Sequence, residues 1–234
     1  MELNKNIWNS EDFIEFKNYL ISLGNKDFLD FHKKLVPGES LIIGIKIPIL
    51  REIAKKISKG NLISFLELKA NFHEEKLVKI FVLSYIKDFD LLLNYLDGFV
   101  YEIDNWAVCD SITCLKLFKK NLDKGFKFID NLLLEESEYV IRSGFVLLLS
   151  FYINDDYIDY ILRKVVEVKF DAYYVKMVIA WLISVCFVKY PDKTILILDG
   201  QLAKFTHNKA ISKICDSFRV DNRSKENIKK YRLK

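Results

Sequence analysis

The sequence of 234 residues has few residues that interrupt or cross-link a chain: three prolines, eight glycines and four cysteines. Glycine and proline are the strongest breakers of regular structure, so their scarcity predicts long regular elements. The cysteines Cys109, Cys114, Cys186 and Cys215 form no Cys-x-x-Cys pair and lie among apolar residues. We therefore expect reduced, buried thiols rather than a disulfide framework. The three histidines lie far apart and show no metal-ligand spacing, so we expect no metal site.

Long hydrophobic runs are also missing. The longest, 145–153 and 177–188, are shorter than the roughly 20 residues that span a membrane. Residues 1–12 contain no apolar signal core, so we expect a cytoplasmic protein. The net charge of +4 is too small to indicate a nucleic-acid partner by itself, and the distribution of the basic residues must decide. A hydrophobic content of 51% excludes an intrinsically disordered chain.

Helical spacing of apolar residues runs through nearly the whole chain. One such segment begins at Asn9 and Ser10, which are good helix-capping residues, and stops at Gly24. Strand-like alternation over a useful length is absent. The pattern predicts a dozen or more helices joined by short polar links. Because no low-complexity linker divides them, we expect residues 1–234 to form a single domain.

A faint internal repeat accompanies this pattern. Three apolar segments can be aligned on their serines, Ser84, Ser150 and Ser184, which are 66 and then 34 residues apart. A unit of about 33 to 35 residues is typical of helix-pair solenoids. We therefore predict an all-α fold, a curved α-solenoid of HEAT-like repeats whose concave face binds the partner, in preference to a helical bundle.

The stretch DNWAVCD, residues 104–110, combines an aromatic and a carboxylate. Trp106 and Asp110 are four residues apart, so on a helix they share one face. Asp104 precedes the helical run and is expected to cap it. Asp110 lies beyond the capping positions, and its alternative interpretation is an ordinary solvated helix face.

Three further candidate site residues lie on later helical segments. Arg142 is the only charged residue between Glu138 and Asp155, so it either pairs with a carboxylate or contacts an anion outside. Lys176 holds the corresponding place in the next repeat, and a column of basic residues would suit a phosphate backbone. Trp181 lies among apolar residues and belongs either to the core or to a site.

The end of the sequence, residues 217–234, contains the one clear basic cluster. Only Asp221 and Glu226 oppose its cations. Either DNA binding or a frayed, solvated tail explains it. The cations are Arg219, Arg223, Lys225, Lys229, Lys230, Arg232 and Lys234.

Taken in order, these segments resemble the AlkD family of alkylpurine DNA glycosylases, which are built from HEAT-like repeats. The resemblance extends from about residue 44 to residue 232. The ordered set of Trp-x-x-x-Asp, a later arginine and a second tryptophan carries it. The matching segments are GIKIPILREIA, HEEKLVKIFVL, DNWAVCD, YVIRSGFVLLL and YYVKMVIAWLIS.

The resemblance implies a role for each residue of this set. Asp110 matches the catalytic carboxylate, Trp106 and Trp181 match the aromatic pair around the sugar, and Arg142 matches the residue that holds the DNA backbone. It also implies base excision repair on double-stranded DNA, with release of cationic bases such as 3-methyladenine and 7-methylguanine. No cofactor and no backbone cleavage are expected, and we expect a monomer.

Physical chemistry makes the same residues sensible. A cationic alkylpurine departs as a neutral base, while positive charge develops on the deoxyribose, as in glycoside hydrolysis. A fixed carboxylate stabilises such charge by roughly 3–4 kcal/mol, and an aromatic face adds about 0.5–2 kcal/mol. Trp106 and Asp110 would then share a face because both serve one cation, with Val108 and Cys109 pointing into the packing.

Two other functions stay open at this stage: a DNA-binding solenoid without turnover, and a protein–protein scaffold. Fold alone does not choose among the three functions. Members of the family often carry another basic residue one turn after the second tryptophan, where residues 182–184 read Leu-Ile-Ser. The heavy use of lysine, isoleucine and asparagine suggests an AT-rich, bacterial genome.

Overall fold

The computed structural model describes residues 1–36 and 41–234. Within these ranges the chain forms fourteen α-helices, three short 3-10 helices and no strand, apart from one isolated bridge between Leu41 and Phe72. The all-α prediction is therefore confirmed. Contacts divide the chain into two compact units, Met1–Asn121 and Leu122–Lys234. The expectation of a single domain stays a prediction.

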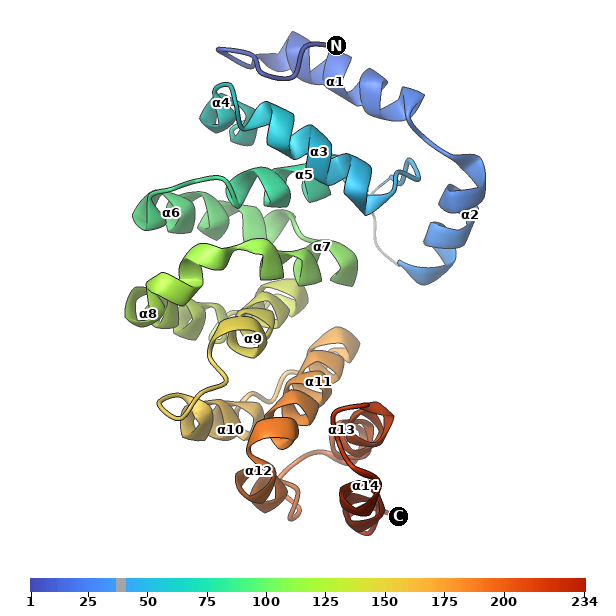
Figure 1. The fold of residues 1–234 in the computed structure, drawn as a ribbon, viewed down its shortest axis with the longest axis vertical. Helices are drawn as coiled ribbons and strands as arrows, with labels where there is room; N and C mark the ends of the chain where they lie inside the picture. The colour runs from blue at the N-terminus through green and yellow to red at the C-terminus, as the bar shows by residue number, and fades with distance from the viewer. Residues whose placement is uncertain (37–40) are drawn as a thin grey trace. The chain divides into compact units, whose positions relative to one another are not determined.

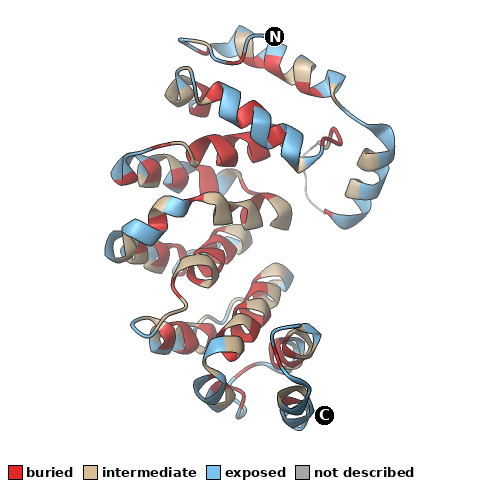
Figure 2. Ribbon diagram, viewed as in Figure 1, coloured by how far each residue is buried: buried red, intermediate tan, exposed pale blue. Residues whose placement is uncertain are grey.

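The first unit is organised around one central helix, α5 (Figure 1). This helix packs against α3, α4, α6 and α7, and all eleven of its residues are buried (Figure 2). The first helix begins as expected, because the Asn9 side chain accepts a hydrogen bond from the Asp12 N–H. The helices are α1 Ser10–Ser22, α2 Lys26–Leu35, α3 Ile47–Ile57, α4 Leu62–Leu66, α5 His73–Leu83, α6 Phe89–Phe99, η1 Val100–Glu102, α7 Trp106–Asp110, η2 Ser111–Cys114 and η3 Lys116–Lys120.

A buried carboxylate on α5 fixes the loop that precedes α3. Glu74 accepts hydrogen bonds from the main-chain N–H groups of Ile43 at 2.9 Å, Gly44 at 2.7 Å and Ile45 at 3.3 Å. Gly44 has φ +91°, and a Cβ there would lie 2.8 Å from the main-chain oxygen of Asn25. This position therefore requires glycine, and the loop it permits lies against the start of α2.

The second unit stacks three long helices, with α11 packed against both α9 and α13. The helices α7, α9, α11 and α13 begin at Trp106, Glu138, Tyr173 and Lys204, so their steps are 32, 35 and 31 residues. These steps lie close to the unit of about 33 to 35 residues in the sequence, and with the all-helical chain they are consistent with an α-solenoid. The helices of this unit are α8 Leu122–Leu132, α9 Glu138–Phe151, α10 Ile158–Glu167, α11 Tyr173–Lys189, α12 Pro191–Ile197, α13 Lys204–Asp216 and α14 Asn222–Lys229.

The expectation of buried thiols is confirmed for two of the four cysteines. Cys109 and Cys186 are buried, Cys114 and Cys215 are half-buried, and none of them forms a disulfide in the part of the chain that the structure describes. Burial raises the pKa of Cys114 to about 11 and that of Cys186 to about 12. Searched over the same ranges, the structure contains no helix with the length and hydropathy of a membrane span.

Candidate functional site

The helix that carries Trp106 and Asp110 is short and firmly capped. Asn105, and not the expected Asp104, is its N-cap residue. The Asn105 side-chain oxygen accepts hydrogen bonds from the N–H groups of Ala107 and Val108, both at 3.1 Å. The expectation for Asp104 was wrong by one residue, since the chain enters the helix only at Trp106.

Asn105 is itself held by a buried histidine. Its side-chain N–H groups donate to Asp104 Oδ1 at 2.9 Å and to Nδ1 of His73 at 3.2 Å. Asn105 is 1% exposed and His73 is fully buried. Burial, with the neighbouring His32 and Lys76 as smaller causes, lowers the pKa of His73 to about 3. The imidazole is therefore neutral at physiological pH, and its Nδ1 lone pair accepts the hydrogen bond from Asn105.

Two lysines of α5 hold the segment that leads into α7. Lys76 Nζ lies 3.0 Å from Asp104 Oδ2, and Lys79 Nζ lies 3.1 Å from Glu102 Oε1. Both lysines are buried, and burial lowers the pKa of Lys79 although Glu102 opposes the shift. Asp104 thus has a structural role as an ion-pair partner in place of the expected cap.

The shared face of Trp106 and Asp110 is confirmed. Both side chains are half-buried on α7, whereas Val108 and Cys109 between them are fully buried, as the sequence predicted. The indole N–H of Trp106 donates to the main-chain oxygen of Leu35 at 3.1 Å. The ring is thereby fixed against the end of α2 while part of it stays accessible.

In the second unit, Arg142 links α9 to α11. It is 5% exposed, and its Nη1 donates to the main-chain oxygen of Tyr174 at 2.7 Å. Glu138 accepts the N–H of the same tyrosine at 2.6 Å, so α9 binds both main-chain polar groups of one residue in the first turn of α11. Trp181 lies two turns further along α11 and is half-buried, so it is not a fully buried core residue.

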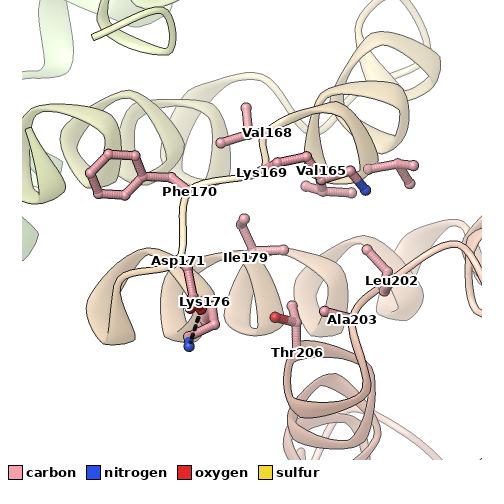
Figure 3. A pocket seen from close by; sticks show the side chains of 11 residues that line it. Val165, Val168, Lys169, Phe170, Asp171, Lys176, Ile179, Leu202, Ala203 and Thr206 are labelled. Atoms are coloured by element: carbon pink, nitrogen blue, oxygen red, sulfur yellow. Dashed lines mark hydrogen bonds and ion pairs between the residues drawn. The ribbon is translucent and has the colours of Figure 1, made fainter. Parts of the chain in front are cut away.

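The other predicted basic residues lie at the surface of the second unit. Lys176 Nζ pairs with Asp171 Oδ1 at 2.6 Å, and this hydrogen bond lowers the pKa of Asp171. Figure 3 shows the pair beside a largely apolar cavity of about 240 Å³. Arg219 and Arg223 are exposed, just before and just inside α14.

The candidate residues thus fall into two groups by unit. Trp106 and Asp110 belong to the first unit, whereas Arg142, Lys176 and Trp181 belong to the second. Among the residues that the structure describes, no cluster of three or more histidine, cysteine, aspartate or glutamate side chains could hold a metal ion.

Sequence reasoning missed two supporting residues, Asn105 and His73. For Asn105 a signal was present, because asparagine directly before a helical run is among the best N-cap residues. For His73 there was none, since its partner is 32 positions away and only the fold brings them together.

Comparison with known proteins adds one finding. A family model described as DNA alkylation repair enzyme matches residues 16–168, a span of 153 of the 234 residues that includes Trp106, Asp110 and Arg142. No curated protein and no solved structure matches the chain.

Proposed function

The chain belongs to the DNA alkylation repair enzyme family, and on that premise we propose that it is a monofunctional DNA glycosylase acting on cationic alkylpurines in duplex DNA. The substrates would include 3-methyladenine and 7-methylguanine. One observation carries the proposal: an accessible tryptophan and an accessible carboxylate share a short helix whose start is fixed by buried hydrogen bonds.

Asp110 is the group that would stabilise the transition state. Alkylation makes the purine a cation that leaves as a neutral base, so the reaction needs no general acid. As the glycosidic bond breaks, positive charge moves onto the deoxyribose. A carboxylate beside that sugar stabilises the charge and orients the attacking water.

The cap of α7 supplies the rigidity that such electrostatic stabilisation needs. A charge lowers a barrier most when it is already in place, because no reorganisation then accompanies the reaction. Asn105 binds two amides of the first turn and is itself bound by His73. Trp106 is held by Leu35, so its ring can present one face to the cation.

The second unit would supply the grip on DNA. We propose Trp181 as a second aromatic contact to the DNA, and Arg142 and Lys176 as contacts to the phosphate backbone. Arg219 and Arg223 on the exposed surface would extend these contacts. Each phosphate neutralised by a cation releases counterions, which makes the binding salt-dependent.

Two lysines of α5, which pair with the segment just before α7, are consistent with hydrolysis without strand cleavage. A bifunctional enzyme uses a neutral amine as its nucleophile. Lys76 and Lys79 are engaged in ion pairs with Asp104 and Glu102 instead. Water is therefore the proposed nucleophile, and an intact strand with an abasic site is the proposed product.

The test is base release from methylated duplex DNA by the full chain. We expect free 7-methylguanine and 3-methyladenine, with strand breaks only after alkali treatment. A uracil-containing duplex should stay intact, because uracil is a neutral base and a poor leaving group. Salt-sensitive DNA binding without any release would contradict the proposal and indicate a non-catalytic DNA-binding protein. Absence of both would indicate a protein–protein scaffold.

A further inference from the structure

An open groove of about 460 Å³ runs along α13 in the second unit. Three of its lining residues are cations, and none of the described residues that line it is acidic. Such a lining favours a polyanion over a protein surface of mixed charge. The groove is lined by Lys204, Phe205, Asn208, Lys209, Ser212 and Arg232.

The groove is built by folding residues 231–233 back onto α13. Asn208 pairs twice with Leu233, donating to its oxygen at 2.9 Å and accepting its N–H at 3.0 Å. His207 Nε2 donates to the oxygen of Tyr231 at 2.7 Å, and Arg232 donates to Ser212 Oγ at 3.0 Å. These contacts hold Arg232 beside the lysines of α13. Residues 231–233 are therefore not the frayed, solvated tail that was one of the two explanations of the basic cluster.

Two exposed aromatic rings accompany these cations. Phe205 is 39% exposed and Tyr173, at the start of α11, is 53% exposed, with ring centroids 6.0 Å apart. Lys176 Nζ lies 5.2 Å and Lys209 Nζ 5.9 Å from the centre of the Phe205 ring. Aromatic and cationic side chains therefore lie close together near the starts of α11 and α13, two helices that pack together (Figure 1).

We propose that this surface, Tyr173 with the groove along α13, binds an unpaired strand of DNA. Lys204, Lys209 and Arg232 would contact its phosphates, and bases would stack on Phe205 and Tyr173. A duplex cannot use the rings in this way because its bases are already stacked on one another. Exposed rings set among cations are the combination by which proteins bind single strands without sequence preference.

The inference rests on the proposed function only in taking DNA as the partner, and not on base release. A protein that opens or bends DNA around a lesion would expose unpaired nucleotides for such a surface. An acidic protein would bind the cations without needing the aromatic rings. Removing the rings therefore distinguishes a single strand of DNA from an acidic protein as the partner.

The experiment measures binding of the full chain to an oligothymidine of about 12 nucleotides, within the usual size of a single-strand site. Binding to a lesion-free duplex of the same length is measured alongside. Phe205→Leu and Tyr173→Leu keep an apolar side chain but remove the ring. Each should weaken oligothymidine binding about tenfold and leave duplex binding unchanged, since stacking contributes about 1–3 kcal/mol per base. Phe218→Leu is the matched control, because Phe218 is fully exposed and does not line the groove.

Salt dependence tests the phosphate contacts separately. Lys209→Ala and Arg232→Ala should each reduce the salt slope for oligothymidine by about 0.7. Wild-type affinity in both ring variants, an equal loss in Phe218→Leu, or an equal loss on duplex would overturn the proposal. Base release from methylated duplex by a wild type that binds no oligothymidine would overturn this proposal alone. Oligothymidine binding through the rings without any base release would instead overturn only the glycosylase assignment.

Discussion

Trp106 donates its indole N–H to the main-chain oxygen of Leu35 at 3.1 Å, a hydrogen bond between residues 71 positions apart. It joins α7, which carries the candidate carboxylate, to the last residue of α2. A second contact joins α2 to α5, where the His32 and His73 rings meet edge to face at 4.9 Å. The position of α2 and the orientation of the Trp106 ring are therefore coupled.

Trp106→Phe should release this coupling while keeping an aromatic face. We expect faster hydrogen exchange of the amides in α2, because one of the hydrogen bonds that hold this helix is lost. Hydrogen exchange with mass spectrometry measures the change. Trp8→Phe is the control, since the Nε1 of Trp8 is buried without a hydrogen-bond partner among the described residues. Unchanged exchange in α2 after Trp106→Phe would show that the indole hydrogen bond does not hold the helix.

Asn105→Ala should lower both stability and base release. It removes the cap of α7, which costs about 1 kcal/mol in free energy of unfolding, and it also leaves His73 Nδ1 without its donor. We expect a tenfold or greater loss of base release, because Asp110 is then less firmly held. Asp88→Ala is the control, because the Asp88 side chain caps α6 in the same way, accepting from the Leu91 N–H at 2.8 Å. This variant should lose a similar amount of stability and keep wild-type base release. Equal release by wild type and Asn105→Ala would mean that the cap does not position Asp110.

The free energy of unfolding should decrease as the pH is lowered from about 6.5 to about 3, because His73 is buried as a neutral ring. The folded-state pKa of His73 is about 3, against 6.5 for an ordinary histidine, chiefly because the ring is buried. Above pH 6.5 the ring is neutral in both states, and its contribution is fully present. Below that pH the unfolded chain binds a proton that the folded protein excludes, so the free energy of unfolding falls by up to about 1.4 kcal/mol per pH unit.

The His73→Gln variant isolates this effect, since glutamine can still accept from Asn105. Denaturant unfolding at several pH values should give a shallower decline for the variant than for wild type. The carboxylates titrate in both proteins, so only the difference between the two curves reports on His73. Parallel curves would show that His73 does not stay neutral in the folded protein.

Arg142→Ala should affect both packing and DNA binding. Removing a charged donor from the Tyr174 carbonyl should lower the free energy of unfolding by about 1.5–3 kcal/mol. If the guanidinium also contacts a phosphate, the salt slope for duplex binding should fall by about one. Binding titrations at several salt concentrations measure this slope. A lower stability with an unchanged salt slope would identify Arg142 as an internal linker of α9 and α11 only.

Local patterns were enough to predict much of the fold. Asn9 caps its helix as expected, and the repeat spacing reappears in the first residues of α7, α9, α11 and α13. The buried positions of Val108 and Cys109 followed from the shared face of Trp106 and Asp110. The cap and the shared face depend on residues within a few turns of one another, and the repeat depends on a local pattern that recurs along the chain.

Contacts between distant segments could not be predicted from the sequence. Nothing in the sequence pairs Trp106 with the oxygen of Leu35 or Asn105 with His73, because tertiary packing alone brings them together. The burial of Arg142 was hidden for the same reason, since its partner is a main-chain oxygen on the next long helix. Asp104 was expected to cap α7, and only the fold shows that the chain enters the helix one residue later, after Asn105.

Single-turnover release of 7-methylguanine from methylated duplex DNA measures whether the Asp110 carboxylate drives base release. Wild type, Asp110→Asn and Asp97→Asn are compared, with Asp97 as an exposed carboxylate of the same unit. We expect a loss of about 100-fold or more for Asp110→Asn, with helicity and DNA binding retained, and wild-type release by Asp97→Asn. Release by Asp110→Asn at the wild-type rate would contradict the account.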